Sequence, residues 1–338
     1  MIGSALLGGI DVHRRAVKAG IARMSFELSV PSRRALLAAA TLLPLAGRAA
    51  EASAAEPKAA RDHYARAARL AGDDPVSRAL VRALTPGSQA PSVRAPKPLR
   101  IFDNVAVLST GFVSATAVLT SAGVILIDAL SSPDEARKVI VPGLRSVGVD
   151  PSTIKYVVAA HGHSDHFGGA QYLADRYGAR VMMARADWDL VAAGSPAHAP
   201  DRDLEIADGG RLTLGDTTVT LHHTPGHTPG TVSPIFPVRW KGRRFTAMLW
   251  GGTNPPTATA DKRTYLSSVL SFAARMRRAG VDVELNNHGQ SDHGLARMEE
   301  LRGGSGGNPF VIGRDRAQRF MRVMEAMLRG RIASDQGR

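Results

Sequence analysis

The sequence predicts an α/β domain in which layered sheets are covered by helices, with a helical extension before it. Three observations lead to this fold class. Helical and strand patterns interleave along most of the 338 residues. Some strand patterns alternate in hydrophobicity, whereas others are continuous apolar runs, which is typical of strands with two covered faces. Finally, 44% of the residues are hydrophobic, which is enough apolar material for a sizeable core.

The N-terminal residues predict an export signal. Ser32-Arg33-Arg34 precedes an apolar run at 35–46, and Ala52-Ser53-Ala54 has the small-residue spacing of a signal peptidase site. The paired arginines resemble a twin-arginine signal. We therefore expect residues 1–54 to be removed, Met24 to be the natural start, and the mature protein to be periplasmic or secreted. The apolar run is too short for a stable membrane anchor.

Residues 55–98 are predicted to form a helical extension and a linker. Two short helical patterns lie between Lys58 and Leu84, and the second has Asp74 as its N-cap and Pro75 at its first position. A Pro- and Ser-rich stretch at 85–98 follows. It leads into the main domain, which we place at 99–302.

The main domain is predicted to alternate between strands and helices, followed at 303–338 by a glycine-rich loop and a C-terminal helix. Its predicted strands are Val105–Ser109, Ala115–Thr120, Gly123–Asp128, Ile154–Ala160, Arg180–Ala184, Arg211–Leu214, Thr217–His222, Pro234–Val238, Arg244–Leu249 and Val281–Leu285. Its predicted helices are Ser132–Val147, Gly169–Tyr177, Ala186–Ala193 and Asp261–Ala279, and the last helix of the chain is Arg314–Arg329.

Composition restricts the chemistry that the chain can perform. There is no cysteine, which excludes disulfides, thiolate nucleophiles and every cysteine-containing zinc site. A metal ion must therefore be held by His, Asp or Glu. The net charge is +13, but Lys and Arg are scattered along the sequence and aromatic residues are only 5%. We interpret this as a generally basic surface that steers anionic substrates, and we expect no nucleic-acid partner.

The strongest functional signal is His161-Gly162-His163-Ser164-Asp165-His166, directly after a predicted buried strand. Ligands in α/β folds bind where strands end. Four potential ligands in six residues, nitrogen from His and oxygen from Asp, form a typical zinc-binding pattern. A second motif, Thr224-Pro225-Gly226-His227-Thr228-Pro229-Gly230, holds a histidine on a stiff turn after a later strand. The two motifs together predict a metal site.

These two motifs, in this order, resemble the metallo-β-lactamase superfamily over roughly residues 100–300. The resemblance implies an αββα sandwich with two Zn²⁺ ions at one edge of the sheets. It also implies the ligand sets: His161, His163 and His227 would bind one ion, and Asp165 and His166 the other.

Members of this superfamily differ in the residue that supplies the remaining ligand of the second ion. Many members, glyoxalase II and acyl-homoserine lactonases among them, place a bridging Asp after the next strand, but here that stretch, 250–254, has no carboxylate. Two of the three β-lactamase subclasses use a cysteine. The third uses H-x-H-x-D-H and a late histidine, and His288, just past the last strand, matches that position. His293 is the competing residue, and we favour His288.

Three further residues are candidates for supporting roles. Asp128 ends its strand, where it either orients a ligand or is simply solvated. Thr253 and Asn254 are the nearest polar residues to the position at which the third subclass contacts the substrate carboxylate.

The resemblance implies a dinuclear zinc hydrolase that opens β-lactam rings by attack of a zinc-bound hydroxide, with Asp165 orienting the nucleophile and a small molecule as substrate. The alternative within enzymes is a zinc lactonase or another ester hydrolase of this fold. The alternative outside enzymes is a degenerate metal-binding or nucleic-acid-binding module.

Overall fold

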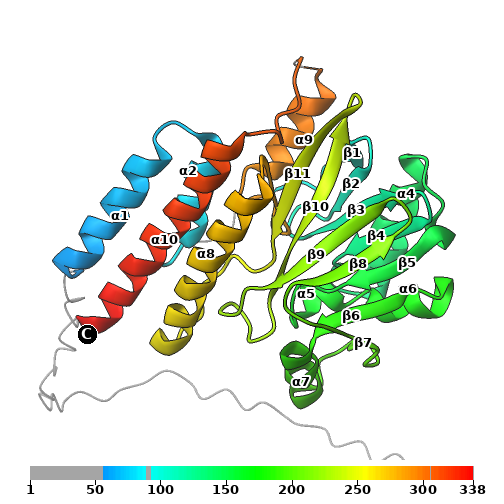
Figure 1. Cartoon of the computed structure of the whole chain (residues 1–338). Helices are drawn as coiled ribbons and strands as arrows, with labels where there is room; N and C mark the ends of the chain where they lie inside the picture. The colour runs from blue at the N-terminus through cyan, green and yellow to red at the C-terminus, as the bar shows by residue number, and fades with distance from the viewer. Residues whose placement is uncertain (1–55, 89–92, 305, 338) are drawn as a thin grey trace, which may run out of the picture. The chain divides into compact units, whose positions relative to one another are not determined.

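The computed structural model describes residues 56–88, 93–304 and 306–337. The predicted export signal lies outside these residues. The described residues belong to one compact unit that runs from Ser53 to Arg338 (Figure 1). No described helix is long and apolar enough to span a membrane.

Two sheets form the centre of this unit. The larger sheet has the strand order β1-β2-β3-β4-β5-β6-β7, antiparallel from β1 to β4 and parallel from β4 to β7. Its strands are β1 (Leu99–Phe102), β2 (Val105–Ser109), β3 (Ser114–Thr120), β4 (Gly123–Ile127), β5 (Ile154–Val158), β6 (Arg180–Ala184) and β7 (Leu204–Ile206). The smaller sheet has the order β12-β11-β10-β9-β8. Its strands are β8 (Gly210–Leu214), β9 (Thr217–His223), β10 (Val232–Trp240), β11 (Arg243–Trp250) and β12 (Val283–Asn286).

Helices cover the outer face of each sheet, which gives the predicted αββα arrangement. The helices that follow β4, β5 and β6 cover the larger sheet, and α8 and α10 cover the smaller one. The helices are α1 (Lys58–Ala71), α2 (Pro75–Leu84), α3 (Pro133–Glu135), α4 (Val141–Ser146), α5 (Ser164–Phe167), α6 (Ala170–Tyr177), α7 (Arg185–Gly194), α8 (Thr259–Ala279), α9 (Gly294–Arg302) and α10 (Arg314–Gln336). Short π- and 3₁₀-helical segments lie at Ala136–Ile140 and Pro151–Thr153.

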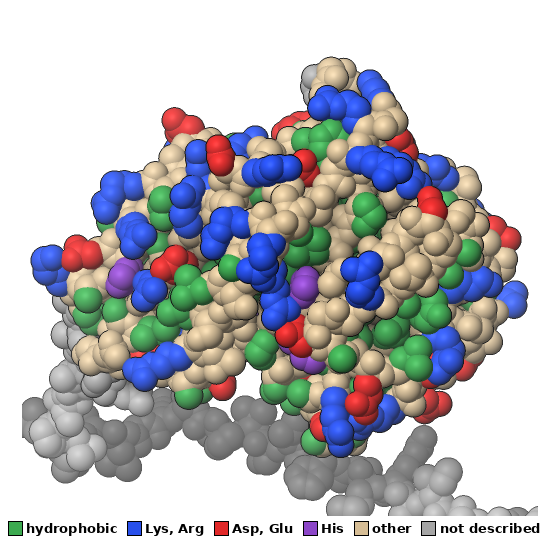
Figure 2. All heavy atoms as spheres, in the orientation of Figure 1, with side chains coloured by type: hydrophobic (Ala, Val, Ile, Leu, Met, Phe, Trp, Pro, Cys, Tyr) green, Lys and Arg blue, Asp and Glu red, His purple; other side chains and the backbone are tan. Residues whose placement is uncertain are grey.

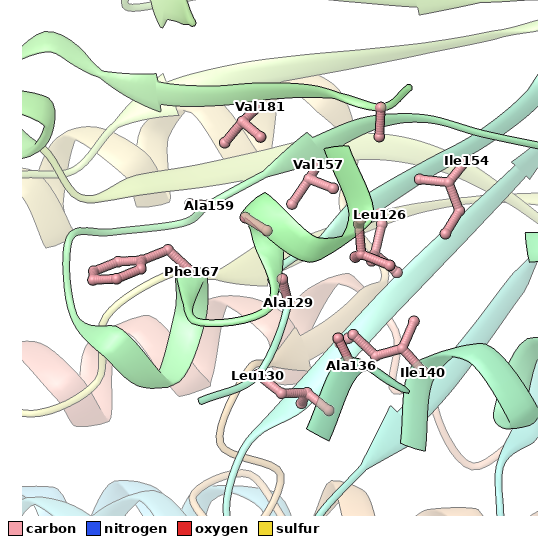
Figure 3. Packing of buried hydrophobic residues seen from close by; sticks show 14 of the residues in the cluster. Leu126, Ala129, Leu130, Ala136, Ile140, Ile154, Val157, Ala159, Phe167 and Val181 are labelled. Carbon is pink, nitrogen blue, oxygen red and sulfur yellow. The ribbon is translucent and has the colours of Figure 1, made fainter. Parts of the chain in front are cut away.

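Three apolar clusters hold these layers together. Between the helices and the larger sheet, Leu126, Val157 and Phe167 are completely buried (Figure 3). Between the sheets, side chains such as Ile125 and Phe236 face one another. Strands β4 and β5 contribute to both clusters and so have both faces covered, which explains their apolar runs.

The third cluster joins the smaller sheet to a layer of helices formed by α1, α2, α8 and α10. In this layer α10 lies between α1 and α8 (Figure 1). The helices approach closely at Gly330, where a Cβ atom would lie 2.4 Å from the ring of Tyr64. The predicted start of α2 is confirmed, because the Asp74 carboxylate caps the helix by accepting a hydrogen bond from the backbone N–H of Ser77.

One predicted helix has a different form. Ser132–Val147 is not a single α-helix, because α3 passes into a π-helical turn before α4 begins. Pro142 explains the break, since it lacks the backbone N–H that would continue an α-helical ladder. Strand β7 and helix α9 were not predicted; β7 has only three residues, and α9 has little amphipathic pattern.

Candidate metal centre

The H-x-H-x-D-H motif begins three residues after β5 ends at Val158 and continues into the short helix α5. His161 and His166 are completely or almost completely buried, while His163 and Asp165 face solvent in part. His227 approaches from the turn between β9 and β10. The structure brings the predicted ligands into two groups with ligand atoms within 4.8 Å of one another: His161, His163 and His227, and His161, Asp165 and His166.

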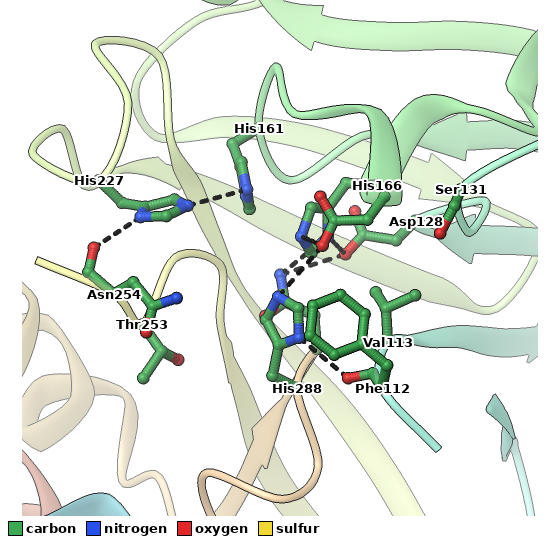
Figure 4. A network of polar contacts seen from close by, with 12 residues as sticks. Phe112, Val113, Asp128, Ser131, His161, His166, His227, Thr253, Asn254 and His288 are labelled. Carbon is green, nitrogen blue, oxygen red and sulfur yellow. Dashed lines mark hydrogen bonds and ion pairs between the residues drawn. The ribbon is translucent and has the colours of Figure 1, made fainter. Parts of the chain in front are cut away.

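Hydrogen bonds fix the tautomers of His161 and His227. His161 Nδ1 lies 2.7 Å from Gly251 O, and His227 Nδ1 lies 2.6 Å from Asn254 O (Figure 4). Because a carbonyl oxygen only accepts, each Nδ1 carries the proton and each Nε2 of the neutral ring carries a lone pair. The two Nε2 atoms are 3.1 Å apart. Two lone pairs this close repel each other unless they share a cation, so the pair is suited to a metal ion.

His166 is held in the same way by Asp128. Asp128 Oδ2 accepts from His166 Nδ1 at 2.8 Å, and its Oδ1 accepts from the backbone N–H of Ala160 at 2.7 Å. Asp128 is fully buried, so the solvated alternative for this residue is excluded. The Nε2 atom of His166 is buried and has no hydrogen-bond partner among the described residues. An orphaned lone pair of this kind is a second feature that fits a metal ion.

His288, and not His293, lies beside Asp165 and His166. Its Nδ1 donates to Phe112 O at 3.0 Å, which leaves the lone pair on Nε2, 3.5 Å from Asp165 Oδ2. The ring also contacts His166, with centroids 5.1 Å apart. His293 begins α9 and instead lies 3.5 Å from Glu300. The geometry therefore agrees with the choice of His288.

The pKa shifts of these side chains are consistent with metal binding. Burial lowers the pKa of His161 well below its ordinary value and that of His227 to about 4, so both rings are neutral ligands near pH 7. Burial also lowers the pKa of His166, but the Asp128 and Asp165 carboxylates outweigh it and raise this pKa to about 9. Burial raises the pKa of Asp165, yet the neighbouring His166 and His288 rings hold it well below its usual range. The two carboxylates that favour positive charge at His166 would equally favour a metal cation bound at its Nε2.

Asp187, at the start of α7, ties the two histidine motifs together. Its Oδ2 accepts from the Gly162 N–H at 2.7 Å and from the Thr228 hydroxyl at 2.6 Å, and its Oδ1 accepts from the Gly230 N–H at 2.7 Å. The side chain is fully buried. Asp187 therefore fixes the distance between the loop of His161 and His163 and the loop of His227.

The end of β11 has no room for a side chain. A Cβ atom on Gly251 would lie 1.9 Å from Val232 O, and one on Gly252 would lie 2.7 Å from His227 Cβ. Glycine is required at both positions because the backbone itself supports the centre through Gly251 O. A carboxylate side chain therefore does not fit at either of these two positions.

The predicted substrate contacts agree less well with the structure. Thr253 is buried and exchanges hydrogen bonds with the Asn286 side chain at 2.8 and 3.1 Å, so its hydroxyl is not available to a substrate. The prediction for Thr253 is therefore wrong, because the chain turns inward after Gly252. Asn254 is exposed and contacts the centre through its carbonyl oxygen, which holds His227.

Comparison with known proteins identifies a family domain within the chain. Residues 108–239 match the family model described as the Metallo-beta-lactamase superfamily. The chain carries a metallo-beta-lactamase superfamily domain. This family consists of hydrolases, typically zinc-dependent, and the H-x-H-x-D-H motif with its two histidine groups fits that chemistry.

The relatives found by sequence and the relatives found by structure have different functional names, hydroxyacylglutathione hydrolase and metallo-beta-lactamase. The chain is 31% identical over 131 residues to a hydroxyacylglutathione hydrolase of Anaeromyxobacter dehalogenans, a match that covers 38% of this chain and 45% of that protein. The chain thus spans about half the length of this curated relative. Among solved structures it is similar to Rm3 metallo-beta-lactamase (TM-score 0.61, 23% identity, 71% of this chain and 94% of that one). It is also similar to BJP-1, a subclass B3 metallo-beta-lactamase of Bradyrhizobium japonicum (TM-score 0.56, 24% identity, 73% and 94%).

Three residues around the metallo-beta-lactamase centre were not predicted from sequence. Asp187 lies within a helical pattern that gives no sign of its role. Asn287 stands next to His288 in the sequence and was not predicted to contribute, yet its amide donates to Gly251 O at 2.9 Å and to Asp128 Oδ2 at 3.2 Å. Phe112 is 53% exposed and its ring meets that of His288 with centroids 5.0 Å apart. A large apolar residue next to Gly111, in the turn between β2 and β3, was the available signal for Phe112.

Proposed function

We propose that this chain is a dinuclear zinc hydrolase that opens β-lactam rings. The observation that carries the proposal is the donor set around Asp165: His166 and His288 close the second half of the centre, and glycines occupy the strand end from which a bridging carboxylate would come. Without that carboxylate, a coordination position remains open for the leaving nitrogen of a cleaved amide.

The protein's own groups would prepare the reaction. Asp165 Oδ2 lies 3.3 Å from His166 Nε2 and 3.5 Å from His288 Nε2, so its ionised carboxylate is placed to orient the attacking water. When bound, zinc supplies the Lewis acid that polarises the scissile carbonyl and lowers the pKa of water towards neutrality. Asp128 holds the His166 ring in place, and Asn287 in turn donates to Asp128 Oδ2, so the geometry does not depend on the substrate.

Phe112 would contact the substrate beside this centre. Its exposed ring stands next to His288, at the tip of the turn between β2 and β3 (Figure 4). An exposed aromatic residue at a catalytic centre is suited to cover the apolar part of a bicyclic ligand. Phe112 lies on the His288 side of the centre only. Contact with it would therefore orient the bicyclic substrate so that it extends across both halves of the centre.

A second function is favoured by the sequence relatives. The hydroxyacylglutathione hydrolase match raises ester or thioester hydrolysis as the alternative, and a lactonase belongs to the same class. Esters and thioesters have better leaving groups than amides, so these reactions tolerate the more crowded site of enzymes with a bridging Asp. The open position in this chain is the reason that we rank amide cleavage first.

The deciding experiment compares substrates on zinc-loaded protein. We expect kcat/KM for a penicillin, a cephalosporin or a carbapenem to exceed that for acyl lactones and for a hydroxyacylglutathione thioester. Background rates on all three β-lactams together with efficient turnover of a lactone or the thioester would replace this proposal with the second function. Treatment with a chelator should abolish the activity, and added zinc should restore it. This result would show that the activity, whichever of the two it is, depends on the metal centre.

We further propose that the mature enzyme acts in the periplasm or outside the cell. This rests on the arginine pair and small-residue stretch within 32–54, outside the described residues. Replacing Arg33 and Arg34 by Lys should leave an uncleaved protein in the cytoplasm. Unchanged export of that variant would exclude the twin-arginine route.

A further inference from the structure

The positive charge of this chain is concentrated in one layer of the fold. Helices α1, α2, α8 and α10 contain 17 Lys and Arg and 5 Asp and Glu, a net charge of +12. The segments 85–258 and 280–313, which contain both sheets, have 18 Lys and Arg and 19 Asp and Glu, a net charge of −1. The interpretation of this charge as a generally basic surface is therefore wrong: folding brings together helices from both ends of the domain.

The basic residues face outward on this layer. Eleven of the 17 are exposed, which follows from the packing of the apolar faces of the helices against each other and against the smaller sheet. These residues are Lys58, Arg61, Arg66, Arg69, Arg78, Arg82, Arg263, Arg277, Arg278, Arg314 and Arg322. Figure 2 shows Lys and Arg as the prevailing charged side chains over α1, α10 and α8. We call the outward surface of the four helices the basic layer.

An exposed apolar side chain lies among these arginines. Arg263, Leu270 and Arg277 follow one another at seven-residue intervals and therefore share one face of α8. Leu270 is 43% exposed, and it lines a groove between α8 and α10 together with Arg277, Arg322 and two acidic residues, Asp315 and Glu325. Guanidinium groups beside an exposed leucine combine phosphate recognition with a side chain that can enter an apolar phase.

We propose that the basic layer docks this protein on the surface of an anionic phospholipid bilayer. Three helices side by side present a broad surface that matches a plane of phosphate head groups better than the groove of a duplex, which is read by a single inserted helix or ribbon (Figure 1). The aromatic rings of α8 and α10, Tyr265, Phe272 and Phe320, are buried, so the layer lacks the exposed rings on which single-stranded bases stack. The metal centre lies at the edge of the sheets, built from residues outside these four helices, so docking would leave it unobstructed.

Charge reversal on the basic layer tests this proposal. The probe is a vesicle of phosphatidylglycerol and phosphatidylcholine, compared with pure phosphatidylcholine, in a co-sedimentation assay at low salt and at 0.5 M salt. The variant Arg263→Glu/Arg277→Glu/Arg322→Glu should bind the anionic vesicles about a hundredfold more weakly, since each basic residue near such a surface contributes about fivefold. High salt should weaken binding of the unmodified protein in the same direction.

A matched variant separates a docking surface from net charge. Lys155→Glu/Arg211→Glu/Arg244→Glu changes the total charge equally, at exposed positions on the two sheets. It should lose no more than about fivefold, because the basic layer remains intact. Leu270→Ser should weaken the binding that persists at high salt and leave hydrolysis by the metal centre unchanged.

Several outcomes would overturn the proposal. Equal losses in the two triple variants would show that net charge alone controls binding. Equal binding to pure phosphatidylcholine vesicles would exclude recognition of an anionic bilayer surface. Binding of the unmodified protein to double-stranded DNA or RNA but not to anionic vesicles, abolished by the basic-layer variant, would replace the membrane with a nucleic-acid partner. Melting temperatures of all variants, measured alongside, should stay close to that of the unmodified protein because every substituted side chain is exposed.

Discussion

Replacing Asp187 by Asn should loosen the metal centre from outside its ligand shell. The carboxylate accepts three hydrogen bonds and donates none, so an amide at this position must turn its NH₂ group towards at least one donor. In its best orientation the amide oxygen keeps Gly162 and Thr228, and the NH₂ group faces the buried Gly230 N–H. A buried donor left unsatisfied costs about 1–3 kcal/mol, and the two remaining bonds lose their charge-assisted strength, about 1 kcal/mol each.

The expected total is therefore about 3–5 kcal/mol, a large fraction of the stability of a typical domain. Part of this loss should appear as weaker zinc binding, by about 10–100-fold, since the loops of His161 and His227 are no longer held at a fixed distance. Competition with a chromophoric chelator measures the zinc affinity, and calorimetry measures the melting temperature of the same samples. The control is Asp189→Asn, two residues along α7, whose carboxylate is exposed and pairs with Arg202. If both variants match the unmodified protein in zinc affinity and melting temperature, Asp187 does not position the centre.

Three other predictions concern single side chains. His288→Ala should leave one tightly bound zinc ion by elemental analysis whereas His293→Ala leaves two, and the reverse result would show that the wrong late ligand was chosen. Phe112→Ala should raise KM for the preferred substrate by about tenfold with little change in kcat, since its exposed ring contributes binding alone; a matching fall in kcat would contradict this. The Arg275 guanidinium lowers the pKa of Asp208 to about 2, so this pair stabilises the fold above the unfolded pKa of about 4 and loses its effect as pH falls towards 2. Urea unfolding should therefore show Asp208→Asn less stable than the unmodified protein at pH 7, with the difference vanishing near pH 2; a difference independent of pH would exclude the ion pair as its source.

The sequence predicted those parts of this protein that depend on local pattern. Strands such as Val105–Ser109 and Arg180–Ala184 were predicted to the residue, because their apolar runs are bounded by turns. The ligand histidines were predicted because several donors stand within one short motif. Asp187 and Asn287 were missed because their roles come from tertiary contacts with loops that lie far away in sequence. Thr253 was assigned wrongly for the same reason, since only the packing of β11 against His227 turns its side chain inward. The clustering of basic residues also escaped prediction, because it requires α1 and α10 to be neighbours.

The placement of α10 between α1 and α8 has a consequence for biosynthesis. Helix α1 is the first described element to leave the ribosome, yet α10, its principal packing partner, is the last. The apolar face of α1, with Ala60, Ala67 and Ala71, therefore has no native surface to cover it until translation of the whole domain is complete. A chain halted before residue 314 would expose this face and the outer face of α8 together. Completion of the fold thus depends on synthesis of α10, and products truncated before it would be left with an unburied apolar surface that quality-control proteases and chaperones recognise.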